Sequence, residues 1–312
     1  MLDFTFGDVF CGAGGTSRGA TRAGGRSQFA YDYNTKYNQA DVYRSNFGYC
    51  THKPIQDVSV EEILGLPDID LLCASPPCQG WSTARDTNLP DREDKDVGIE
   101  ILPFVAMKKP KFIFLENVKR YANAPVFTAI CQVLRELGYF VEFKVVNLAD
   151  WGVPQSRVRT IMLATNQGDF QFPFRNEKTI GWGDVVSADA IARCQKVEFT
   201  NHQKARLPAN LRPYSLLERE GARDDRNIQC RYFHEPSFTI KALGGDRHWR
   251  QADIWTGSQL YGVSVEVCRK LQTFPDEHLL PEDNVHASYG IGNSVPPLFA
   301  EKLLSDFISL FA

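Results

Sequence analysis

A cysteine in an unusual setting is the residue of this chain best suited to covalent chemistry. Cys78 follows Ser75-Pro76-Pro77, which in turn follows residues 69–73, an apolar run short enough to be a buried strand. Because the two prolines end that strand, Cys78 is predicted just beyond its carboxyl end, where open parallel α/β sheets bind ligands. Its neighbours are wrong for a core, so it is a candidate nucleophile. Four other cysteines are expected to pack as small hydrophobic residues: Cys11, Cys73, Cys131 and Cys268.

Two further groups of polar residues lie where they could act on the same ligand. Glu116 follows the buried-strand run 112–115, which delivers it to the same sheet edge as Cys78. A carboxylate at that edge must be paired, solvated or used. Gln155, Arg157 and Arg159 precede a strand at 160–164 and project to one side if that stretch alternates. The alternative for the two arginines is ion pairing on a strand face.

The amino terminus predicts a strand, a glycine-rich turn and a helix. The strand covers residues 4–10, glycines occupy positions 12, 14 and 15, and residues 18–23 are compatible with a helix. Glycines at such a turn let the backbone approach a ligand, while a helix amino terminus favours negative charge. A second strand at 28–33 is expected to end in an acid that accepts hydrogen bonds from ribose hydroxyls.

The segment Ser75-Pro76-Pro77-Cys78-Gln79-Gly80 resembles the catalytic motif of the DNA cytosine-5 methyltransferases. Further motifs of that family recur in the family's order from Asp8 to Pro296, which is far more specific than one short match. The resemblance implies that Cys78 attacks the cytosine, that Glu116 grips its N3 and N4 edge, and that Arg159 lies at its O2. Gln155 and Arg157 complete the family's Gln-x-Arg-x-Arg motif, with Arg157 expected to organise the site or the backbone.

The resemblance also implies S-adenosylmethionine (AdoMet) as the methyl donor. No metal site is expected, because the cysteines and histidines lack zinc-like spacing. The family's acidic ribose position falls on Asn34, whereas Asp32 is the nearby carboxylate, so both remain candidates. Asp57 resembles the residue that contacts the adenine amino group, but it is also suited to cap a helix beginning near residue 60. The residues expected at the cofactor are Phe10, Gly12, Gly14, Gly15, Asp32, Asn34, Asp57, Val58, Pro76, Asn293 and Val295.

Composition sets the class of protein and its partners. With 312 residues, 43% of them hydrophobic, the chain can bury a large core and hold one big and one small domain. The net charge is −3, yet residues 193–250 carry 12 Lys or Arg against 7 Asp or Glu. A basic segment on an acidic body is typical of one lobe that touches a polyanion. The resemblance implies that this polyanion is double-stranded DNA.

The sequence also indicates where the protein works and with what partners. No Cys-x-x-Cys pair, long apolar run or signal peptide is present, so we expect a cytoplasmic protein with reduced thiols and no membrane contact, nucleoid-associated if prokaryotic. We expect a monomer without an obligate protein partner, although a cognate restriction endonuclease is a candidate partner.

The predicted architecture is a doubly wound α/β sheet of the AdoMet-dependent methyltransferase type with a smaller target-recognition domain. Residues 1–171 form the first part of the catalytic domain, 172–250 the recognition domain, built largely of loops, and 251–312 the return to the catalytic domain. A helix near 264–273 and a final helix beginning with Pro297 are expected in the returning segment. In the family, the loop 81–98 closes over DNA, with Gln79 and Ser82 as candidate contacts. Candidates for reading bases are Asn201, His202, Gln203, Lys204, Arg223, Arg226, Arg247 and Arg250.

These observations predict a DNA cytosine-5 methyltransferase that flips its target base out of the duplex. The strongest alternative is a transfer RNA cytosine-5 methyltransferase, because the two classes share motifs. Amino-group methylation is disfavoured because those enzymes carry an Asp/Asn-Pro-Pro-aromatic motif in place of Ser75-Pro76-Pro77-Cys78. A non-enzymatic homologue is disfavoured because Cys78, Glu116 and Arg159 are all present.

Overall fold

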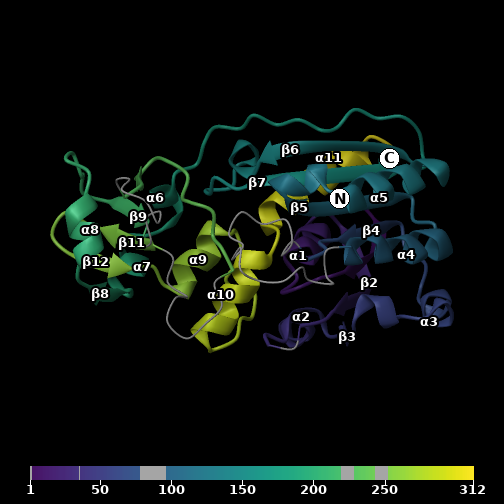
Figure 1. Ribbon diagram of the computed structural model, residues 1–312, viewed down its shortest axis with the longest axis horizontal. Coiled ribbons are helices and arrows are strands. Elements are labelled where there is room, and N and C mark those ends of the chain that lie inside the picture. Colours follow the sequence, from purple (N-terminus) through teal and green to yellow (C-terminus); the bar gives the residue numbers. More distant parts are fainter. Residues whose placement is uncertain (1, 35, 78–95, 219–227, 243–251) are drawn as a thin grey trace. The chain divides into compact units, whose positions relative to one another are not determined.

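The computed structural model describes residues 2–34, 36–77, 96–218, 228–242 and 252–312 (Figure 1). The chain folds into two compact units. The first comprises Met1–Asn147, Val158–Arg175 and Phe299–Ala312, and the second comprises Leu148–Arg157 and Asn176–Leu298. Each unit is built around its own sheet.

The first unit contains a seven-stranded sheet in the order β3-β2-β1-β4-β5-β7-β6. The strands are β1 (Phe4–Val9), β2 (Gly25–Asp32), β3 (Thr51–His52), β4 (Leu71–Ala74), β5 (Phe112–Val118), β6 (Phe140–Asn147) and β7 (Val158–Thr165). The pairs β1/β2, β2/β3, β1/β4 and β4/β5 are parallel, whereas β7 is antiparallel to both β5 and β6. The doubly wound α/β class predicted from the sequence is confirmed, with a mixed rather than wholly parallel sheet.

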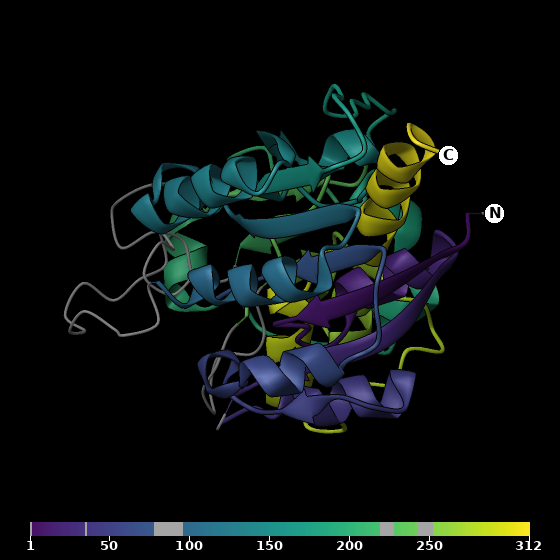
Figure 2. The ribbon, with the colours of Figure 1, turned by 90° about the vertical axis from the view of Figure 1, so that its right-hand side faces the viewer.

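Helices cover both faces of this sheet, which explains why its central strands β1, β4 and β5 are buried along almost their whole length. The helices are α1 (Gly15–Arg22), α2 (Gln39–Phe47), α3 (Val60–Gly65), α4 (Ile101–Lys108), α5 (Pro125–Glu136) and α11 (Pro297–Ser309), with 3-10 turns η1 (Ile55–Asp57), η3 (Val97–Glu100) and η4 (Lys119–Asn123). In Figure 2, α4 and α5 lie on one face and the yellow α11 on the other. Ile113 packs toward the side of α4 and α5, whereas the ring of Phe112 meets that of Phe307 of α11 with centroids 5.4 Å apart. The final helix begins at Pro297 as predicted.

The second unit carries an antiparallel sheet in the order β10-β9-β11-β12-β8. Its elements are η5 (Leu148–Trp151), α6 (Trp182–Val185), α7 (Ala188–Ala192), β8 (Gln195–Val197), α8 (Asn201–Arg206), β9 (Ser215–Glu218), β10 (Cys230–Tyr232), β11 (Ala252–Trp255), β12 (Leu260–Gly262), α9 (Val265–Leu271) and α10 (Asn284–Asn293). Most of the described residues between 172 and 250 lie in loops, as predicted, but the prediction missed the short strands β8, β9 and β10 among them. Strands of three or four residues give too short an alternation to stand out in a sequence.

The predicted boundary after residue 250 falls within this sheet, because β11 and β12 pair with β9 and β8. Residues 251–298 cluster with the second unit and only Phe299–Ala312 with the first. The functional division into a catalytic and a target-recognition domain stays a prediction. No helix among the described residues is both long and apolar enough to span a membrane.

Candidate active site

The strand that leads to Cys78 ends beside the strand that carries Glu116. Ala74, the last residue of β4, pairs with Leu115 of β5 in parallel register, so Glu116 is the next residue beyond that pair. The side-chain amide of Asn117 donates to the carbonyl oxygen of Pro76 over 2.9 Å. The Pro76-Pro77 segment is therefore tied to the end of β5. Cys78, Gln79 and Ser82 lie outside the described residues.

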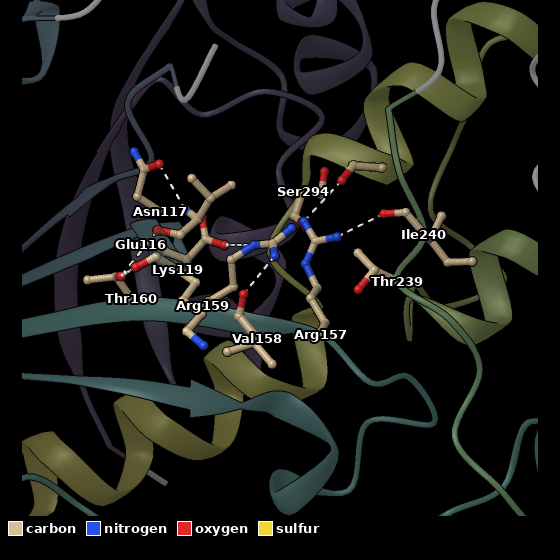
Figure 3. A network of polar contacts seen from close by, with 12 residues as sticks. Glu116, Asn117, Lys119, Arg157, Val158, Arg159, Thr160, Thr239, Ile240 and Ser294 are labelled. Carbon is tan, nitrogen blue, oxygen red and sulfur yellow. Dashed lines mark hydrogen bonds and ion pairs between the residues drawn. The ribbon is translucent and has the colours of Figure 1, made fainter. Parts of the chain in front are cut away.

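Glu116 and Arg159 face each other in a buried ion pair (Figure 3). Arg159 Nε lies 2.9 Å from Glu116 Oε1, and the two side chains are 13% and 6% exposed. The two charged groups are close enough for an ion pair, but their geometry is not that of a hydrogen bond. Glu116 Oε1 is buried and accepts no hydrogen bond from the described part of the chain. A buried carboxylate oxygen of this kind can accept a hydrogen bond from a bound ligand.

The antiparallel pairing of β5 with β7 brings these two residues together. Val118 pairs with Arg159 and Glu116 with Ile161, which places Arg159 near the end of β5 where Glu116 lies. The Thr160 hydroxyl donates to the carbonyl oxygens of Val118 and Lys119 at 3.1 and 3.0 Å, which fixes the chain just after Glu116. The sequence did not single out Thr160, because a threonine in a strand is ordinary.

Gln155 and Arg157 lie in the second unit, whereas Arg159 lies in the first. The predicted alternating stretch does not include Gln155 and Arg157, because β7 begins only at Val158. Arg157 is 1% exposed and donates to the carbonyl oxygens of Ile240, Gly292 and Ser294 at 2.9, 3.0 and 3.1 Å. Its guanidinium group therefore links the backbone at Ile240 to the backbone at residues 292–294, two segments that are far apart in the sequence (Figure 3).

Gln155 supports the same two segments. Its Nε2 donates to Gln272 Oε1 at 2.6 Å and its Oε1 accepts from the Ile240 amide at 2.8 Å. Gln272 in turn donates to the carbonyl oxygens of Ile291 and Ser294 at 3.0 and 2.6 Å. Gln272 is a residue that sequence reasoning missed, since a glutamine in a helix-compatible segment gives no signal. This network fixes the segment that contains Asn293, which is exposed, and Val295, which is buried.

The turn after β1 has the backbone of a ligand cradle. Phe10, Gly12 and Gly14 have φ angles of 59, 52 and 86°. A positive φ is costly for phenylalanine, so the surrounding structure must impose it. A Cβ at Gly12 would meet nothing within 4 Å, whereas one at Gly14 would lie 2.5 Å from the Phe47 ring. Gly12 therefore borders open space, and Gly14 allows α2 to approach the turn.

Asp32 ends β2 beside this turn, and the structure gives Asp32 and Asn34 different surroundings. The Gly12 amide donates to Asp32 Oδ1 at 3.1 Å. Burial raises the pKa of Asp32 to about 6, against the lowering effect of the Gly12 amide and His52. Asn34 Oδ1 instead accepts from the amides of Lys36 and Tyr37 at 2.9 and 2.8 Å, as in a local turn.

Asp57 does not cap the helix that follows it, which was the alternative to its role at the cofactor. The amino-terminal cap of α3 is Ser59, whose side chain accepts from the Glu62 amide, while Asp57 is an exposed residue of η1. Asp57 is thus not used as a cap. Val58 next to it is partly buried and packs against the main core.

A buried acid in β1 was missed as a site component by the sequence analysis. Asp8 is 1% exposed and accepts from the Ser17 hydroxyl at 2.6 Å; Ser17 Oγ also lies 2.8 Å from the Tyr43 hydroxyl. Burial raises the pKa of Asp8 to about 7 despite the hydrogen bond from Ser17. The network links β1, α1 and α2 around the glycine-rich turn. A carboxylate inside an apolar strand is the signal that could have identified it.

The predicted base-reading residues separate into different classes. Gln203 is buried, its Nε2 donates to Asp253 Oδ2 at 2.8 Å, and its Oε1 accepts from the Thr200 amide, so it caps α8. Asn201 and Lys204 are exposed on the same helix. Arg223, Arg226, Arg247 and Arg250 lie outside the described residues, as does the side chain of His202. Among the described residues, no group of three or more His, Cys, Asp or Glu side chains is arranged to hold a metal ion.

Comparison with known proteins places these features in one family. Residues 4–309 match the family described as C-5 cytosine-specific DNA methylase. The Type II methyltransferase M.HaeII of Haemophilus aegyptius is 35% identical over 312 residues, which cover 96% of this chain and 92% of the relative. The Type II methyltransferase M.HhaI of Haemophilus parahaemolyticus is 26% identical over 95% of this chain and 91% of its own length.

Solved structures show the same fold. A putative DNA modification methyltransferase encoded within an E. coli prophage superimposes with a TM-score of 0.74 at 18% identity, covering 99% of both chains. The S. pombe Dnmt2 methyltransferase superimposes with a TM-score of 0.69 at 15% identity, covering 99% of this chain and 98% of its own.

Proposed function

Because the chain belongs to the family of C-5 cytosine-specific DNA methylases, we propose that it methylates C5 of a cytosine flipped out of a specific duplex DNA sequence. The observation that carries the proposal is the buried Glu116–Arg159 pair at the end of β5, next to the segment that leads to Cys78. A cytosine ring carries a donor at N4 and an acceptor at O2, and this pair offers one group for each.

The Cys78 thiolate is the nucleophile of the proposed mechanism. It adds to C6 of the cytosine, and electron density moves into the ring toward C5 and N3. The base binds the protonated form of Glu116, which accepts from N4 and supplies its proton at N3, while the Arg159 guanidinium donates to O2. The N3 proton returns to Glu116 when Cys78 leaves. Once C5 carries the methyl group, loss of the C5 proton expels Cys78 and restores the aromatic ring.

The family uses AdoMet, and the residues of the first unit fit this group. Bound AdoMet supplies an electrophilic methyl group on a sulfonium centre. Open space at Gly12 leaves room for a ligand against the backbone, and Asp32 ends β2 as an acceptor for ribose hydroxyls. Asp32 is proposed for this role over Asn34, whose side-chain oxygen already accepts two backbone amides. Phe10, Gly14, Gly15, Asp57, Val58 and Pro76, all in the first unit, are proposed to complete the pocket, whereas a cofactor contact of Asn293 and Val295 in the second unit stays a prediction.

Gln155 and Arg157 are proposed as positioning residues. Both side chains are buried, and they donate hydrogen bonds to residues between 240 and 294 instead of facing an open surface. They hold the segment that contains Asn293 and Val295. The second unit is proposed to read the DNA sequence, with Asn201 and Lys204 as the exposed candidates on α8. Since relatives are named Type II methyltransferases, a restriction endonuclease that cuts the same sequence is the proposed biological partner.

The test is methyl transfer from labelled AdoMet to unmethylated duplex DNA and, in parallel, to unmodified transfer RNA. Methylated positions are then read by conversion sequencing. The proposal predicts 5-methylcytosine at one short recurring DNA sequence and none in the RNA. Methylation confined to transfer RNA would replace the proposal with the alternative substrate class.

A further inference from the structure

Two buried cysteines from separate elements lie side by side next to the glycine-rich turn. Cys11 belongs to that turn, and Cys50 lies between α2 and β3. Their Sγ atoms are 3.5 Å apart, and the residues are 6% and 8% exposed. The expectation that Cys11 packs as a small hydrophobic residue is correct as far as burial goes, but its neighbour is a second thiol.

The backbone on each side of the pair is fixed. The Cys11 amide donates to the Tyr31 carbonyl at 3.0 Å, and the Cys11 carbonyl accepts from the Gly14 amide at 2.9 Å. Arg44 Nε donates to the Cys50 carbonyl at 2.8 Å. Because both backbones are held, the two sulfurs stay neighbours rather than meeting by chance.

We propose that Cys11 and Cys50 form a reversible disulfide when the protein meets hydrogen peroxide, and that this bond weakens AdoMet binding. The Cys50 thiolate attacks one peroxide oxygen, the O–O bond breaks, and a sulfenic acid and hydroxide form. The Cys11 sulfur then attacks the Cys50 sulfur, and the S–O bond breaks. Two thiols and one peroxide thus give one disulfide and two waters, with the thiol protons ending on the water oxygens.

The first attack is assigned to Cys50, which is the more exposed residue of the pair at 8% against 6%. Burial, together with the contact to Cys50, raises the pKa of the Cys11 thiol well above its usual range. Oxidation is consequently expected over many minutes rather than at the rate of an exposed thiolate.

The disulfide is expected to weaken AdoMet binding because Cys11 directly precedes Gly12 of the glycine-rich turn. This step rests on the proposed function. Disulfide sulfurs bond at about 2 Å, so those of Cys11 and Cys50 must approach by roughly 1.5 Å. The next residue, Gly12, donates its amide to Asp32 at 3.1 Å. Drawing Cys11 toward Cys50 disturbs both the open cradle and the proposed ribose acceptor. By linkage, bound AdoMet must then disfavour the disulfide by the same factor.

The experiment treats the full chain with hydrogen peroxide, with and without AdoMet, and maps disulfide-linked peptides by mass spectrometry. Affinity for labelled AdoMet is measured by equilibrium dialysis before oxidation, after it, and after a thiol reductant. Cys50→Ala removes the pair. Cys131→Ala is the matched control, because Cys131 is equally buried in the same unit but its Sγ lies 3.9 Å from the Met162 sulfur.

We expect a Cys11–Cys50 peptide in wild type and in Cys131→Ala, with an AdoMet affinity about tenfold lower that the reductant restores. Cys50→Ala should keep its affinity under peroxide. If that variant does not fold, the test is the rate of Cys11–Cys50 disulfide formation in wild type, which should be slower in saturating AdoMet than without it. Absence of the linked peptide, or a linked peptide with unchanged AdoMet affinity, overturns the proposal. The mapping needs no AdoMet, so reduced protein that fails to bind AdoMet contradicts the proposed function alone.

Discussion

Asn117 Nδ2 lies 2.9 Å from the carbonyl oxygen of Pro76, so a residue of β5 holds the loop that leaves β4. Asn117 is buried and directly follows Glu116. One residue of β5 thus faces Arg159 while the next anchors the segment that precedes Cys78. This arrangement brings the segment that leads to Cys78 next to Glu116, which is 38 positions later than Cys78, as the proposed mechanism requires.

Gly12→Ala should weaken AdoMet binding without greatly destabilising the protein. Gly12 has a φ of 52° and open space at the Cβ position, so the cost to folding is about 1 kcal/mol of backbone strain. The methyl group would enter the volume proposed for the ligand, and we expect at least tenfold weaker binding by calorimetry. Gly48→Ala is the matched control, since Gly48 has a φ of 88° and equally open surroundings. Equal AdoMet affinities for the two variants would contradict the cradle.

Glu116 and Arg159 should be energetically coupled. Removing one member of a buried ion pair strands the other charge, at a cost of about 3–5 kcal/mol. We expect Glu116→Gln and Arg159→Met each to lower the free energy of unfolding by that order. The double variant should lose clearly less than the sum. Urea titrations of all four proteins test this, and additive losses would show that the pair is not coupled. Methyl transfer should fall by about 10²–10⁴ in Glu116→Gln.

Arg157→Lys should destabilise the second unit. A lysine ammonium cannot match the planar fork that reaches three carbonyl oxygens, so buried acceptors lose their donor. The expected loss is about 2–4 kcal/mol in the free energy of unfolding. Arg193→Lys, at an exposed arginine paired with Glu266, should leave the unfolding midpoint unchanged. Similar midpoints for the two variants would contradict the structural role of Arg157.

Asp8 should make stability fall as the pH rises. Its pKa is raised by burial to about 7 in the folded chain, against about 3.9 when unfolded. Between these values the folded protein keeps a proton that the unfolded chain loses. The stabilisation is therefore full below pH 4 and is lost as the pH rises through 7. Between pH 5 and pH 8, wild type should lose about 2–3 kcal/mol relative to Asp8→Asn.

Asp70 supplies a control of opposite sign for the Asp8 experiment. Although burial raises its pKa, hydrogen bonds from Thr5 and Lys111 hold that pKa below the usual value. Its contribution is present at neutral pH and is lost on acidification. Asp70→Asn should therefore approach wild type as the pH falls. A constant difference between wild type and Asp8→Asn across this pH range would contradict a buried, proton-retaining Asp8.

The sequence predicted those parts of the structure that depend on local pattern. The runs at 4–9, 71–74 and 112–118 are mostly apolar and almost wholly buried because both sheet faces are covered, and Pro297 begins a helix with regular apolar spacing. The same patterns predicted that Glu116 follows a strand at 112–115, whereas β5 extends to Val118 and includes Glu116 near its end.

What the sequence did not reveal depends on tertiary contacts. Gln203 has the composition of a base reader, yet a buried bond to Asp253 uses its side chain. Gln155 and Arg159 share a motif but belong to different units, because β7 begins at Val158. The short strands of the second sheet pair with partners up to 67 positions away. Gly262 of β12 pairs with Gln195 of β8 on one side and with Asp253 of β11 on the other. No local pattern encodes such pairings.

The central claim is covalent catalysis by Cys78, and trapping on a fluorinated base tests it most directly. Duplex DNA carrying 5-fluorocytosine at the mapped target is incubated with AdoMet and wild type, Cys78→Ser or Cys131→Ala, then resolved under denaturing conditions. Fluorine at C5 cannot leave as a proton, so Cys78 should stay attached to C6 after methyl transfer. We expect a denaturation-resistant complex with wild type and Cys131→Ala, and none with Cys78→Ser, which should still bind DNA. A covalent complex or sustained methyl transfer with Cys78→Ser would contradict the account.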